Sequence, residues 1–140
     1  MSELDDDVIG AAEEAVSSFQ DRAEGPLDFS NESLQHVEGL LDEASDFAPE
    51  MPEEVVDGII QKLGSYVLEV GRRQFGGKYY WHQDEPVLVV GEPEFKIAMK
   101  AWGKVKGRLS GDSADNIPFF FKGFHDRVRD AKPGDDVLYV

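Results

Sequence analysis

The chain has 140 residues and carries 29 Asp and Glu against 14 Lys and Arg, which gives it a formal net charge of −15. It contains no cysteine, so disulfides, zinc–thiolate sites and thiol catalysis are excluded. A hydrophobic content of 41% is too high for global disorder, and no apolar run approaches the roughly 20 residues of a membrane-spanning helix. We therefore expect one acidic globular domain over residues 1–140, without a membrane partner.

The first residues and the missing cysteine favour the cytoplasm. Residues 1–7 are acidic where a secretory signal would be basic, and no apolar stretch follows them. A reducing compartment agrees with a chain that has no thiol to oxidise.

The charge is divided unevenly along the chain. Residues 1–60 hold 18 acids and a single base, Arg22, whereas residues 61–140 hold 11 acids and 13 bases. Such an asymmetry can mark an interaction surface, or the acidic half can fold partly over the basic half and leave the rest solvated.

Three helices are predicted in the acidic half. Ser2 can cap a helix over residues 2–22, and Ser30 or Asn31 can cap a second helix. Pro52 suits the first turn of a third helix, which has a broad apolar stripe and is therefore expected to be the most buried of the three. The glycine pair at 76–77 ends it.

The pattern then changes to the alternation and aromatic content typical of strands. Two strands form a predicted hairpin, a third follows it, and a fourth lies at the end of the chain, with two helices between the third and the fourth. In chain order these elements cover residues 78–82, 86–90 and 94–97, a helix from 98 to about 111, a helix over 117–128 and a strand over 137–140.

These elements predict the α+β class: three N-terminal helices, a small and mainly antiparallel sheet, and two further helices packed on that sheet. Residues 1–75 form the acidic helical part of the domain and residues 76–140 the part that contains the sheet.

Four residues are the candidates for catalysis in this sequence. Three of them meet at the predicted hairpin turn, and the fourth lies on a later helix: His82, Asp84, Glu85 and His125. No two histidines have the i, i+4 spacing of a zinc-binding helix, and we expect neither a metal nor a cofactor.

A phosphate-binding loop is not expected at residues 71–78, the segment that approaches its pattern most nearly. Its spacing is one residue off, Tyr79 stands where Ser or Thr would hold magnesium, and it leads from a helix into a strand.

Nucleic-acid binding is not expected either. Lys96, Lys100 and Lys104 recur every four residues near Trp102, as in a basic helix face with an aromatic neighbour. The net charge of −15 would repel a polyanion, so we expect this basic stripe to face the protein's own acidic helices.

Residues from about 58 to 125 resemble small bacterial α+β proteins of unknown function, some of which have relatives similar to immunity proteins against secreted toxins. The residues that carry the resemblance are Leu63-Gly64-Ser65-Tyr66, Tyr79-Tyr80-Trp81, Val87-Leu88-Val89-Val90-Gly91, the Trp102-to-Asp112 segment and Phe119-Phe120-Phe121. They are mostly core and turn residues, and they imply a fold and an immunity-like role but no catalytic residue.

We therefore expect a non-enzymatic interaction protein that binds a basic protein surface. The most specific version of this expectation is an immunity-like protein or inhibitor. The binding acids are expected to be Asp5, Asp6, Asp7, Glu38, Asp42 and Glu43. Two alternatives remain open: a small hydrolase or metal-dependent enzyme that uses the four candidates named above, and a charge that serves solubility alone. The sequence leaves the oligomeric state open.

Overall fold

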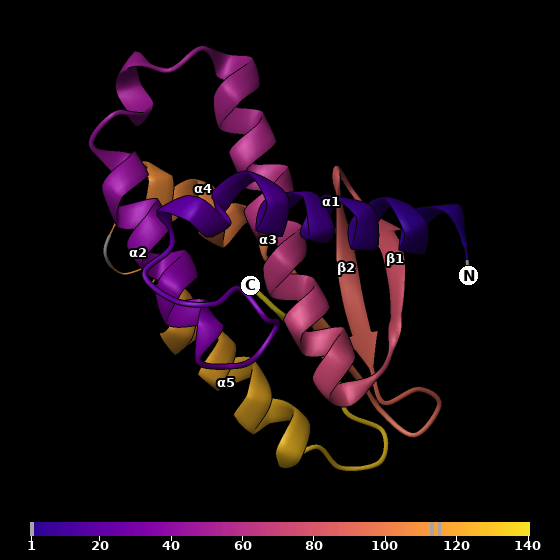
Figure 1. Ribbon diagram of the computed structural model, residues 1–140. Coiled ribbons are helices and arrows are strands. Elements are labelled where there is room, and N and C mark those ends of the chain that lie inside the picture. Colours follow the sequence, from indigo (N-terminus) through magenta and orange to yellow (C-terminus); the bar gives the residue numbers. More distant parts are fainter. Residues whose placement is uncertain (1, 113, 115) are drawn as a thin grey trace.

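The computed structural model describes residues 2–112, 114 and 116–140, and in that part of the chain five α-helices and four strands form an α+β fold (Figure 1). Three helices precede the sheet and two follow its first three strands, as the sequence predicted. In chain order the elements are α1 (Glu3–Phe19), the 3₁₀ turn η1 (Gln20–Arg22), α2 (Ser33–Ser45), the 3₁₀ turn η2 (Ala48–Glu50), α3 (Glu53–Phe75), β1 (Lys78–His82), β2 (Glu85–Val90), β3 (Lys96–Met99), α4 (Trp102–Leu109), α5 (Ile117–Arg129) and β4 (Asp136–Tyr139).

Helix α1 begins at the predicted cap. The Asp5 amide donates to Ser2 Oγ at 3.1 Å and the Ser2 amide donates back to Asp5 Oδ2 at 3.4 Å, so a capping box satisfies two amides at the helix start. Val8, Ala12 and Ala15 are buried where α1 lies across α3. The small alanine side chains allow the two helix axes to approach closely.

Helix α3 is the centre of the molecule. Every residue of the stretch 63–71 is buried, because the sheet, α1 and α4 all pack against this part of the helix. The prediction that the third helix is the most buried is thus confirmed. The helix ends at Gly76, whose φ of +77° suits a residue without a side chain.

The sheet has the order β1-β2-β3-β4. The first three strands are antiparallel neighbours, and β4 joins β3 in parallel, with Val137 opposite Ile97. Helices α1, α3 and α5 contact the strands, and the strand residues that face the core are buried, among them Leu88 and Ile97.

The other face of the sheet, which we call the open face, has no helix on it among the described residues. Tyr80 and Leu138 are large exposed side chains of this face, and they line a cavity of about 320 Å³ together with Val89 and Ala98.

The third strand and the fourth helix each begin later than the sequence predicted. The Gly91 carbonyl accepts from the amides of Glu94 (3.1 Å) and Phe95 (3.3 Å), and this turn delays β3 until Lys96. Ala98, which matched a helical repeat, therefore belongs to a strand, and α4 starts at Trp102.

The predicted basic stripe is consequently not the face of one helix. Lys96 lies in β3 and Lys100 directly follows that strand, whereas Lys104 belongs to α4. The spacing of four residues between these lysines thus spans two kinds of secondary structure.

Deleting residues 137–140 should remove β4 and expose the outer edge of β3. The Lys100 amide, which donates to the Tyr139 carbonyl at 3.0 Å, should then lose its protection from hydrogen exchange. Leu138→Ala, which keeps the backbone and changes an exposed side chain, should leave that protection in place. Unchanged exchange at Lys100 after the deletion would show that β4 does not pair with β3 in solution.

Candidate functional site

The acids at the start of α1 point mainly toward solvent. Asp6 and Asp7 are exposed and Asp5 is half-buried, since its carboxylate belongs to the capping box with Ser2. In the part of the chain that the structure describes, none of the three has an ion-pair partner. Asp5 and Asp6 lie in the first helical turn, where an acid complements the helix dipole, and this position leaves the charge of Asp6 free to interact with a partner.

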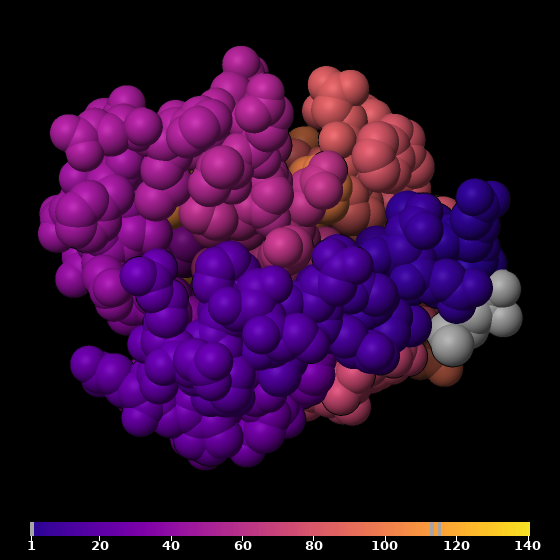
Figure 2. Space-filling model, turned by 45° about the horizontal axis from the view of Figure 1, so that its top comes forward, coloured from indigo at the N-terminus to yellow at the C-terminus, as the bar shows by residue number. Residues whose placement is uncertain are grey.

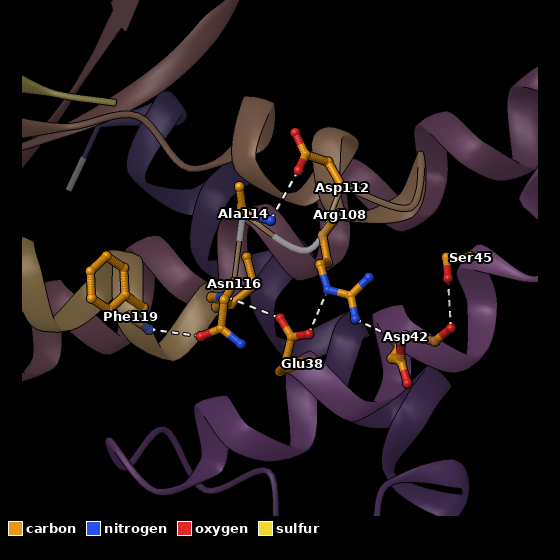
Figure 3. Close-up of polar contacts among 9 residues, drawn as sticks. Glu38, Asp42, Ser45, Arg108, Asp112, Ala114, Asn116 and Phe119 are labelled. Atoms are coloured by element: carbon orange, nitrogen blue, oxygen red, sulfur yellow. Dashed lines mark hydrogen bonds and ion pairs between the residues drawn. The ribbon is translucent and has the colours of Figure 1, made fainter.

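Two of the acids assigned to partner binding hold α4 against α2 (Figure 3). The Arg108 guanidinium donates from Nε to Glu38 Oε2 and from Nη2 to Asp42 Oδ1, the latter at 2.6 Å. Glu38 also accepts from the Ile117 amide at 3.1 Å, so one carboxylate ties α2 to both α4 and the start of α5. We call these contacts the Arg108 clamp.

The two acids of the Arg108 clamp differ in their exposure to solvent. Arg108 is only 7% exposed, and Glu38 lies beside it with both oxygens occupied. The Asp42 side chain is 72% exposed and can still meet a partner. Glu43, the last of the six predicted binding acids, is exposed and has no ion pair among the described residues.

The catalytic candidates lie in two separate places. His82 and Glu85 are opposite each other where β1 and β2 meet the turn, and Asp84 is exposed within that turn. His125 lies on α5, 5.2 Å from the Phe75 ring between ring centroids, and lines a cavity between α2 and α5. His82 instead lines the cavity of the open face, so the two histidines do not share a pocket.

Glu85 is the most perturbed of these candidates. Burial raises the pKa of its carboxyl, and the attraction of Lys100, whose Nζ lies 3.8 Å from Glu85 Oε2, offsets part of that effect. Its Oε1 atom is buried and has no hydrogen-bond partner among the described residues. No group of three or more histidine or carboxylate side chains within the described segments could hold a metal ion.

A buried carboxylate that the sequence pattern did not single out lies in α3. Glu69 is 0% exposed and accepts from Arg72 Nε at 2.6 Å, from Arg73 Nε at 2.8 Å and from the Tyr79 hydroxyl at 2.8 Å. Arg73 also stacks on the Phe29 ring, with Cζ 3.7 Å from the ring centroid. The two arginines at i+3 and i+4 of Glu69 were the signal available in the sequence.

The electrostatics of Glu69 follow from these contacts. Burial by itself raises the pKa of the carboxyl, but the hydrogen bonds from Arg72, Arg73 and Tyr79 outweigh burial and hold the pKa below its ordinary value. With all its bonds made to neighbouring side chains, Glu69 joins the end of α3 to β1 and is a structural residue.

Glu38→Gln and Glu43→Gln remove one charge each from α2 but should differ in their effect on stability. The first leaves Arg108 with a weaker partner in a buried position and should cost about 1–3 kcal/mol of unfolding free energy. The second changes an exposed side chain and should cost about 0.5 kcal/mol or less. Chemical denaturation measures both, and equal effects would contradict the structural role of Glu38.

Glu69→Gln should weaken the protein at neutral pH and make it less sensitive to acid. Because the folded-state pKa of Glu69 is depressed, its ionised form stabilises the fold above the unfolded pKa of about 4.3, and this contribution is lost as the pH falls through the folded value. The difference in unfolding free energy between wild type and variant, about 1–3 kcal/mol at pH 7, should therefore shrink below about pH 4. A difference that stays constant from pH 7 to pH 3 would mean that the Glu69 carboxyl does not titrate with folding.

No described helix combines the length and the apolar character needed to cross a bilayer.

Comparison of the chain with protein-family models, with curated proteins and with solved structures finds no match. The resemblance of residues 58–125 to small bacterial α+β proteins stays a prediction. We therefore infer function from the charges and contacts of the chain itself.

Proposed function

We propose that this protein is a non-enzymatic interaction protein that binds a basic surface of another protein through its acidic helices. The observation that carries the proposal is a set of exposed acids without an ion-pair partner among the described residues. We call this set the acidic surface: Glu3, Asp6, Asp7, Glu13 and Glu14 of α1, with Glu43, Asp46 and Glu50 of the segment from α2 to η2.

Figure 2 supports this view of the surface, because α1 and the segment from α2 to α3 occupy the same face of the molecule. Helix α1 has no basic residue in its last turn, and Arg22 is the sole base of residues 1–60. Like charges gathered in this way produce a field of several kT that attracts a basic partner and speeds its approach. Charge that served solubility alone would work equally well if it were spread over both halves.

The resemblance of residues 58–125 suggests a sharper form of the proposal, in which the partner is a basic toxin or enzyme and the acidic surface covers its active region. In this form the protein acts as an immunity-like protein or inhibitor in the cytoplasm. It needs no cofactor, because its effect comes from occupying the partner's surface.

Association with the purified partner should slow by about tenfold or more between low salt and about 0.5 M NaCl, since exposed charges are screened beyond about 10 Å at 0.1 M. The combined variant Asp6→Asn, Asp7→Asn and Glu13→Gln should slow association at low salt. A matched variant that removes three exposed acids of the other half, Glu94→Gln, Asp130→Asn and Asp136→Asn, should change it much less. Association rates from stopped flow or surface plasmon resonance provide the measurement.

Two outcomes would contradict the proposal. Equal rates at low and high salt, with both triple variants binding like wild type, would leave the charge a role in solubility alone. A chemical activity that the acid variants retain and His82→Ala abolishes would favour the enzyme alternative.

A further inference from the structure

An apolar groove opens among the three N-terminal helices, within the acidic half of the chain. It has a volume of about 280 Å³, and its residues come from the end of α1, the second half of α2, the connection to α3, and α3 itself. The lining consists of Phe19, Arg22, Leu40, Glu43, Ala44, Phe47, Met51, Ile59 and Leu63. We call it the α1–α3 groove.

The floor and the rim of this groove differ in burial. Leu40 and Leu63 are buried and belong to the core, whereas Phe47 is 56% exposed and Met51 is half-buried. An exposed phenylalanine beside a methionine offers an apolar surface that can adapt to another side chain. The Phe47 amide donates to the Ala44 carbonyl at 3.0 Å in the turn that ends α2, so the backbone holds this ring at the groove.

The surroundings of the groove are strongly acidic. Exposed acids next to its lining residues include Asp21, Glu43, Asp46 and Glu50, and the lining itself contains one base, Arg22. Three of these acids belong to the acidic surface, so the groove opens beside the surface that attracts basic partners.

We propose that the α1–α3 groove receives the apolar side chains of a basic amphipathic helix from the partner, while the acidic surface binds the lysines and arginines of that helix. This inference rests on the proposed function and names the form of the partner. The groove supplies the apolar contacts that fix the position of the helix, and the acids supply the attraction that brings it there.

Shape and charge together favour this occupant over others. The groove is slightly smaller than the roughly 300–1,000 Å³ of ligand pockets, and its lining has only Arg22 and Glu43 as charged groups, so it suits side chains better than a polar ligand. A helical occupant needs no backbone partners, whereas an extended peptide needs a free strand edge, and the groove is built from helices and turns. A second copy of this chain, itself at −15, would be repelled.

The test uses two synthetic peptides of about 16 residues with identical Lys, Ala and Leu composition. In the patterned peptide Leu recurs at i, i+4, i+7 and i+11, and in the scrambled peptide no helix face is apolar. The patterned peptide should bind the full-length protein at low salt about tenfold or more tightly than the scrambled one. Its binding should perturb the methyl resonances of Ala44 and Met51, which line the groove.

Phe47→Gln, an exposed and uncharged change at the rim, should weaken binding of the patterned peptide by about tenfold. Phe119→Gln is the matched control, because Phe119 is 75% exposed on α5, away from the groove. It should change binding by no more than about twofold.

The results separate the groove from the acidic surface. Equal binding of both peptides, with no effect of Phe47→Gln and no shift at Ala44 or Met51, would overturn the groove and leave the acidic surface in place. Failure of both peptides to bind even at low salt would overturn the two proposals together.

Discussion

The arrangement of this protein depends on one electrostatic constraint. The first 60 residues hold 18 acids and one base, so cations from the rest of the chain must come to them if they are to be neutralised. Among the ion pairs of the described residues, only those of Arg108 do so, through the Glu38 and Asp42 carboxylates. Most acidic side chains of residues 1–60 therefore stay on the surface, where they face either water or a binding partner.

Ion pairs are arranged differently in residues 61–140, where bases and acids nearly balance. Glu69 is buried in α3 and is matched by Arg72, Arg73 and Tyr79, all from the part of the chain where bases and acids nearly balance. A buried carboxylate left without such partners would cost several kcal/mol. Charge is thus compensated around Glu69 beside the sheet, whereas most acids of the first 60 residues have no ion-pair partner among the described residues.

Much of the fold could be predicted from local pattern, because capping, apolar periodicity and glycine stops act over a few residues. Ser2, the stripe of α3 and the hairpin of β1 and β2 are examples. The predicted start of β3 came too early because the turn at Gly91 precedes the strand, and the predicted start of α4 came too early because Ala98, a strand residue, matches the helical repeat.

The contacts of the candidate site could not be predicted from local sequence. Arg108 and Glu38 are 70 residues apart, and nothing in their local sequence shows that they meet. The α1–α3 groove likewise exists only because three helices and a turn converge, although Phe47 and Met51 appear in sequence as ordinary apolar residues beside prolines. Net charge, by contrast, is a property of composition, so the acidic half of the chain can be recognised from the order of its residues alone.

If the acidic surface is not neutralised within the folded chain, the stability of the protein must depend on ionic strength, and thermal unfolding at several salt concentrations tests this most directly. Self-repulsion is stronger in the compact state than in the unfolded chain, so its screening should raise the Tm by several degrees between about 0.02 and about 0.3 M NaCl. The pair of Arg108 and Glu38 is largely buried and should be screened much less. A Tm that stays constant or falls over this range would show that the acids are compensated within the chain, and the proposed partner surface would lose its physical basis.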